Sequence, residues 1–128
     1  MSGAAIVQDI LANDGAVTGL VGDRIYYVIA PQGAALPHLV ILKGGLTEEI
    51  MLTGVSGYPA ERIIIACHGT DFPAAEALGD AVIAATRDKS GTFAGKSATV
   101  LRDDVEATDY LPATRTQRRL VGAKVRWR

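Results

Sequence analysis

The sequence predicts an α+β fold, in which two helices pack on one face of a four- or five-stranded, mainly antiparallel sheet. Three observations predict this class. Apolar residues recur at helical spacing near the start of the chain and again after its midpoint. Residues 62–69 are apolar on both alternating faces, and the end of the chain alternates apolar with basic side chains. The resulting order of helix, strands, helix, strands is typical of an α+β domain.

The first 22 residues predict one helix and a shorter helical turn. Apolar side chains recur at helical spacing at Ile6, Val7, Ile10 and Leu11. This spacing predicts a helix over residues 3–12, with Ser2 as its cap and the Asn-Asp-Gly segment that follows as its end. Residues 16–21 predict the helical turn, which Asp14 caps at its start and Gly22 ends.

Two apolar runs flank a proline-bracketed loop early in the chain. Residues 24–29 are rich in β-branched and aromatic side chains and predict a strand. Residues 38–43 predict a second strand, which residues 48–53 extend beyond a bulge or bend at the glycine pair 44–45. The loop between the two runs holds no side chain suited to acid–base, nucleophilic or metal chemistry.

Residues 62–69 predict the centre of the sheet. One face of this strand carries Ile63, Ile65 and Cys67, and the other carries Ile64 and Ala66. A strand that is apolar on both faces is covered on both sides, as central strands are. Residues 53–61, which precede it, predict an exposed turn or a mobile hairpin tip.

The second half of the chain predicts one further helix and two strands. A helix runs from Thr70 or Asp71, with Pro73 near its first position, to about Asp88. Residues 97–107 predict a strand with a bulge near positions 102–103, where the apolar phase slips. The last strand alternates Val121, Ala123, Val125 and Trp127 with Gly122, Lys124, Arg126 and Arg128.

Composition restricts the class of protein. The 128 residues fit a single domain spanning residues 1–128. With 48% hydrophobic and 21% charged residues, the chain does not have the signature of disorder. A net charge of −1 gives no overall attraction to nucleic acid or to an anionic membrane. Cys67 is the single cysteine, which excludes an intrachain disulfide, and the first residues lack the basic start and apolar run of a signal peptide.

Residues 90–97, with the sequence SGTFAGKS, have the composition of a phosphate-binding loop but not its spacing. Gly91 and Gly95 enclose three residues, whereas that motif needs four so that successive backbone N–H groups surround the phosphates. The residues that follow predict a strand where the motif requires a helix. We therefore expect a glycine-rich turn between the second helix and the next strand.

Cys67, His68 and Asp71 are the candidates for nucleophilic catalysis and would define a small hydrolase. Because neighbouring strand residues point to opposite faces, we expect Cys67 in the core and His68 directed away from it. A zinc site would need a carboxylate beside His38, His68 and Cys67. The acidic run at 103–109 lacks the glycine-centred loop of a calcium motif. The sequence thus predicts no catalytic residue, no metal and no cofactor, which favours a module that acts through its surfaces.

Three short pieces lie close together within residues 20–42. They are Gly22-Asp23-Arg24-Ile25-Tyr26, Ala30-Pro31-Gln32-Gly33 and Leu36-Pro37. The helix over residues 71–86 and a near-terminal arginine pair at 118–119 follow them. This combination resembles the tail-completion, or tail-terminator, family of long-tailed bacteriophages and prophages, which also occurs in gene transfer agents. The resemblance runs over most of the chain and is specific in residues 20–42.

The resemblance implies a structural protein of the virion that is assembled in the bacterial host cytoplasm. Such proteins form a ring, usually a hexamer, that caps the tail tube and then offers a surface to the connector of the head. The implied partners are further copies of the chain, the tail tube protein and the connector or stopper protein, while DNA passes through the lumen without specific binding. The alternatives within morphogenesis are a head-completion or stopper protein of the neck and a tube-like subunit.

A ring of this kind needs two different patches on each subunit, because its contacts are head-to-tail. One patch is predicted to comprise Arg24, Tyr26, Tyr27, Pro31, Gln32 and Pro37. The alternative is that the prolines only frame a long loop and that Tyr26 packs inside the domain. Because a DNA conduit should repel phosphates, the lumen is predicted to be lined by Asp103, Asp104, Glu106 or Asp109.

Overall fold

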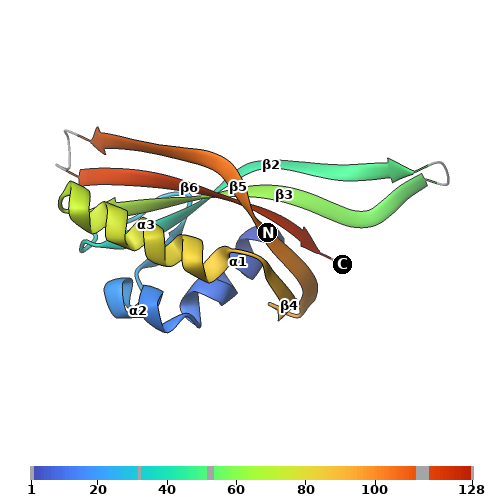
Figure 1. Ribbon diagram of the computed structural model, residues 1–128, viewed down its shortest axis with the longest axis horizontal. Coiled ribbons are helices and arrows are strands. Elements are labelled where there is room, and N and C mark those ends of the chain that lie inside the picture. Colours follow the sequence, from blue (N-terminus) through green and yellow to red (C-terminus); the bar gives the residue numbers. More distant parts are fainter. Residues whose placement is uncertain (1, 32, 52–53, 112–115, 128) are drawn as a thin grey trace.

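A computed structural model describes residues 2–31, 33–51, 54–111 and 116–127. Within these residues three helices lie on one side of a six-stranded sheet (Figure 1). The predicted α+β class and the placement of the helices on one face are confirmed. The predicted numbers are too low, since the described residues contain one more helix and at least one more strand than expected.

The two N-terminal helices begin and end close to their predicted positions. They are α1 (Ser2–Ala12) and α2 (Gly15–Val21). Asp14 caps α2, because its Oδ1 atom accepts hydrogen bonds from the backbone N–H groups of Ala16 and Val17, both at 3.0 Å. Gly22 ends α2 with a φ of 61°, in the region that glycine adopts without strain. The predicted helical turn is therefore a helix of its own.

The sheet has the strand order β1-β2-β3-β6-β5-β4. Its strands are β1 (Ile25–Tyr27), β2 (His38–Met51), β3 (Gly54–Gly69), β4 (Lys89–Phe93), β5 (Lys96–Leu111) and β6 (Thr116–Trp127). All neighbours are antiparallel except β1 and β2, which are parallel. The position of β3 between β2 and β6 confirms the prediction that residues 62–69 are central.

The loop between β1 and β2 returns the chain so that two parallel strands can pair side by side. On its inner side β1 is held by hydrogen bonds from Leu39 N to Arg24 O and from Val28 N to Ile41 O, at 3.0 and 2.9 Å. On its outer side two backbone groups are already used, because Ile25 N donates to Asp23 O at 2.8 Å and Ile29 N donates to Tyr27 O at 2.7 Å. The strand is shorter than the predicted 24–29.

β4 was not predicted. It forms a hairpin with β5 through Ala94 and Gly95, whose φ angles of 51° and 75° are the two positive values that a tight two-residue hairpin turn requires. Residues 89–93 contain Lys, Ser, Gly and Thr and lack an apolar alternation, so nothing in the pattern separates this strand from a turn. Pairing with β5 overrides the weak local preference.

The prediction of a turn over residues 53–61 is wrong for 54–61, which belong to β3. Glycines, Ser56 and Pro59 suggested a turn, but β2 pairs with this segment as far as Gly54. Within the described residues the pairing of β6 with β3 starts at Ala60. Among the described residues, Pro59 therefore lies on a stretch with one neighbouring strand, the kind of position at which sheets accept proline. The tip at 52–53 lies outside the described residues.

Both predicted irregularities are present. The register of β2 against β3 shifts between Lys43 and Gly45, at the predicted glycine pair. The register of β5 against β6 shifts between Arg102 and Glu106, where the apolar phase of the sequence slips.

The core fills the space between the helices and one face of the sheet. Its largest fully buried side chains include Ile6, Leu11, Val17 and Val21 from α1 and α2, Leu78 and Val82 from α3 (Phe72–Thr86), and Leu39, Ile41, Ile63, Ile65 and Val100 from the strands. Asp71 caps α3 by accepting a hydrogen bond from Ala74 N at 2.8 Å, as predicted. Burial of this apolar surface is the main stabilising contribution to the fold.

Candidate assembly interface

The candidates for nucleophilic catalysis do not meet. Cys67 is fully buried in the core, and burial raises the pKa of its thiol to about 12, against a smaller lowering by the charge of Arg119. His68 points to the opposite face of the sheet, where its ring stacks on that of His38. The Asp71 carboxylate caps α3. The predicted divergence of Cys67 and His68 is confirmed.

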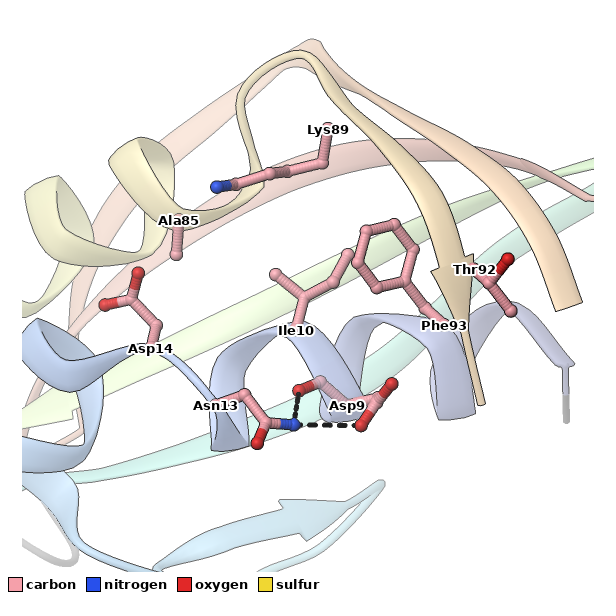
Figure 2. Close-up of a pocket in the computed structure, with 8 residues that line it drawn as sticks. All are labelled: Asp9, Ile10, Asn13, Asp14, Ala85, Lys89, Thr92 and Phe93. Carbon is pink, nitrogen blue, oxygen red and sulfur yellow. Dashed lines mark hydrogen bonds between the residues drawn. The ribbon is translucent and has the colours of Figure 1, made fainter. Parts of the chain in front are cut away.

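Residues 90–97 form the β4–β5 hairpin and not a phosphate-binding loop. The neighbouring cavity, of about 350 Å³, lies between α1, α3 and β4 (Figure 2). It is lined by Asp9, Ile10, Asn13, Asp14, Ala85, Lys89, Thr92 and Phe93. Its carboxylates hold the fold together: Asp9 accepts hydrogen bonds from Asn13 Nδ2 at 3.0 Å and from Ala94 N at 2.9 Å, and Asp14 caps α2.

The described part of the chain contains neither a metal-binding group nor a membrane-spanning helix. Among the described residues, no group of three or more His, Cys, Asp and Glu side chains is placed to hold a metal ion. In the same part of the chain, no helix has the length and apolar character needed to cross a membrane.

Arg24 holds the loop after β1 in place. Its Nε atom donates a hydrogen bond to Pro37 O at 2.9 Å, and its Nη2 atom donates to Leu20 O at 3.3 Å. Arg24 and Pro37 are both half-buried, and the Leu36–Pro37 peptide bond is cis. Arg24 and Pro37 are both predicted to contact a neighbouring subunit. Their hydrogen bond joins the two ends of the loop, and the bond from Arg24 to Leu20 joins the loop to the end of α2.

Tyr26 and Tyr27 lie on opposite faces of the sheet. Tyr26 is half-buried on the face without helices and meets the ring of His38 edge-on, with the ring centroids 5.7 Å apart. Tyr27 pairs with Ile41 on the helix side, is 36% exposed, and has a pKa that partial burial raises. Both residues belong to the predicted subunit-interface patch, which therefore includes side chains on both faces of the sheet.

The most exposed apolar side chains of this region are Val28 and Ile29, at 69% and 78%. The sequence analysis included both in a strand. The backbone of Val28 has a φ of 66°, which is costly for a β-branched residue and ends the strand one residue after Tyr27. Pro31 is exposed next to them, and Gln32 lies outside the described residues.

The face of the sheet without helices has an apolar centre. Val40, Ala66 and Leu120 are paired in register across β2, β3 and β6, and Leu42 and Ile64 form the next row. Val40 and Ala66 are buried but are not part of the core cluster beneath the helices. In the sequence, this face was indicated by residues 62–69, which are apolar on both alternating faces of the strand.

The predicted lumen residues Asp103, Asp104, Glu106 and Asp109 lie on β5, and the last of them pairs in register with Arg118 of β6. Their side chains lie outside the described part of the chain, so their direction stays a prediction. The acidic segment and the basic last strand are neighbours within one sheet.

Comparison with known proteins gives one family and a structural neighbour. A family model described as "Tail completion protein gp17" matches residues 5–127. A chain from a solved structure titled "Virion of native gene transfer agent (GTA) particle" shares 18% sequence identity with a TM-score of 0.76. That similarity covers 98% of this chain and 96% of the other, and it shows a common fold. No curated protein matches.

Proposed function

Because the chain belongs to the tail completion protein gp17 family, and is therefore a structural protein of the virion tail and not an enzyme, we propose that it forms a ring that caps the tail tube. The ring comprises six copies and joins the tube to the connector of the head. The observation that carries the proposal is the family match over residues 5–127, which is nearly the whole chain. In this proposal residues 1–128 act as one domain.

The loop after β1 supplies one contact between subunits. Its exposed side chains, Tyr27, Val28, Ile29 and Pro31, are the parts that can reach a neighbour, together with Gln32. Arg24 and Pro37 hold the loop in shape through the Nε–O hydrogen bond, which lowers the entropy lost when the loop docks. Tyr26 contributes from the other face of the sheet.

The lumen of the ring carries the acidic residues of β5. Asp103, Asp104, Glu106 and Asp109 would repel the phosphates of DNA and so keep the passing duplex from binding. A structure of the ring tests this directly. Carboxylates that point outward, away from the central channel, would contradict it.

Deletion of the gene tests the function. Tails of irregular and overgrown length are expected, because nothing would stop polymerisation of the tube. Normal free tails beside full heads would instead indicate a head-completion or stopper protein of the neck, and complete absence of tails a tube subunit. Electron microscopy of wild-type tails should then show the added ring density at the head-proximal end.

A further inference from the structure

The face of the sheet without helices has an apolar centre and a polar rim, which are the two parts of a typical protein interface. Val40, Ala66, Leu120, Leu42 and Ile64 form the apolar centre described above. Further along the strands, Arg62 of β3, Lys124 of β6 and Leu101 of β5 pair in one row, and Leu101 is 44% exposed. Protein interfaces commonly have an apolar core surrounded by a polar rim.

The described charged side chains of the rim are all basic. The described side chains of Lys and Arg on this face are Arg62, Arg118, Lys124 and Arg126, and no described Asp or Glu side chain lies among them. The three arginines also interact within their own chain, whereas Lys124 is exposed. Among the described side chains, basic residues therefore lie on both sides of the apolar centre of this face.

The helices themselves carry only acidic charged side chains, whereas Arg87 and Lys89 lie just beyond the end of α3. The charged residues within α1, α2 and α3 are Asp9, Glu76 and Asp80, and the caps Asp14 and Asp71 add two further carboxylates. Residues 2–23 and 63–86 contain no Lys or Arg. Arg119 reaches α3 from beneath and lies within 4 Å of both Glu76 and Asp80, but the side chain of Asp80 is still 74% exposed.

We propose that in the ring the helix-free sheet face of each copy packs against the helix side of the next copy. This inference rests on the proposed ring and specifies its surfaces. The two surfaces lie on opposite sides of the same chain and have opposite charge, which is the arrangement that a head-to-tail ring requires. Val40 and Ala66 are already buried within the chain, and the contact would cover the half-buried Leu42, Ile64 and Leu120 around them.

Cysteine cross-linking tests which surfaces meet. The native Cys67 is buried with a pKa of about 12, so introduced cysteines will be the reactive ones. Leu101→Cys marks the sheet face, and Ala77→Cys marks the exposed side of α3. The double variant, assembled on tails in cells, should give a ladder of covalent oligomers after mild oxidation. The matched control is Leu101→Cys with Lys96→Cys, which pairs the sheet face with an exposed residue at the β4–β5 turn, outside every proposed contact.

A charge reversal gives a second readout. Lys124→Glu should raise the dissociation constant of the protein from purified tails about tenfold, because it places a carboxylate opposite an acidic surface. Lys96→Glu makes the same charge change at the exposed β4–β5 turn and should shift the constant less than about twofold. The difference should shrink at high salt, since exposed charges are screened.

The outcomes separate this contact from the ring itself. Equal cross-linking of test and control pairs, or equal effects of the two lysine variants, would overturn the proposed contact while tails still carry a ring. Tails of normal length after deletion of the gene would instead refute the proposed function.

Discussion

Gly79 of α3 lies directly beneath Arg119 of β6, and a Cβ atom added at Gly79 would come within 2.5 Å of Arg119 Cδ. The arginine crosses the helix at this point and donates from Nη1 to Glu76 O and to Asp80 Oδ1, both at 2.9 Å. Helix and sheet can approach this closely because Gly79 has no side chain. The near-terminal arginine that belongs to the family resemblance thus fastens α3 to the sheet.

Gly79→Ala should lower the free energy of unfolding by about 1–3 kcal/mol, because the new methyl group displaces Arg119 from its hydrogen bonds. The control is Gly19→Ala in α2, where nothing lies within 4 Å of an added Cβ atom. That change should raise stability by about 0.5–1 kcal/mol through the better helix propensity of alanine. Urea unfolding measures both, and equal effects of the two variants would contradict the packing described here.

Arg119→Met should cost about 1–3 kcal/mol of stability, because it keeps the apolar stem but removes the hydrogen bonds to Glu76 O and Asp80 Oδ1. Asp80→Asn should cost less than about 1 kcal/mol, because the Asp80 side chain is 74% exposed and its ion pair is screened by solvent. Thermal unfolding of the two variants provides the test. A larger loss for Asp80→Asn would mean that the ion pair, and not the packing, is the main contribution.

Stability should fall as the pH drops below about 6.5, the usual pKa of histidine. Burial lowers the pKa of His38 in the folded protein, and the charge of Arg24 acts in the same direction against the hydrogen bond to Ala35 O. The unfolded chain then binds more protons than the folded chain, so stability rises with pH across this window. His38→Phe should flatten the pH profile between about 5.5 and 7.5 relative to the wild type. Identical profiles would show that His38 does not contribute.

Cys67 should resist thiol reagents in the folded protein. Its side chain is fully buried and its pKa of about 12 keeps the thiol protonated at neutral pH. Modification by a chromogenic disulfide should therefore proceed at the rate of opening of the core and become immediate in denaturant. Rapid labelling under native conditions would mean that the sheet and α3 separate easily.

Ala94→Asn should stabilise the protein by about 0.4–1 kcal/mol. Ala94 has a φ of 51° in the two-residue turn before Gly95, and asparagine tolerates that region better than alanine. Gly95→Ala, at a φ of 75°, should destabilise it by about 1 kcal/mol or more. Calorimetry measures both shifts, and their signs should be opposite.

The sequence was most informative where an element is long and periodic. Residues 62–69 and the helix after Asp71 had strong apolar patterns and are present as β3 and α3. β4 and the outer part of β3 were missed because their residues are poor strand formers that only pairing with a neighbour makes extended. The register of paired strands is set by tertiary contacts and cannot be derived from composition.

The side-chain directions in the candidate interface were less accessible from the sequence than the fold. For the loop within residues 22–37, local pattern could not show that Arg24 bonds inward or that Val28 and Ile29 face solvent. The direction of a side chain after a residue with positive φ depends on the turn and not on alternation. The second apolar face of β3 was visible in the sequence, and the predicted placement of the helices on one face already left it without helix cover.

The two outermost strands of the sheet, β1 and β4, are poor templates for a further strand. β1 has three residues and uses two of its outer backbone groups in local hydrogen bonds, and β4 has Lys89 at its start and Gly91 within it. Unassembled copies would thus be hindered from pairing with one another through β1 or β4. Along these two strands, contacts between copies are therefore expected to form through side chains and not through backbone pairing.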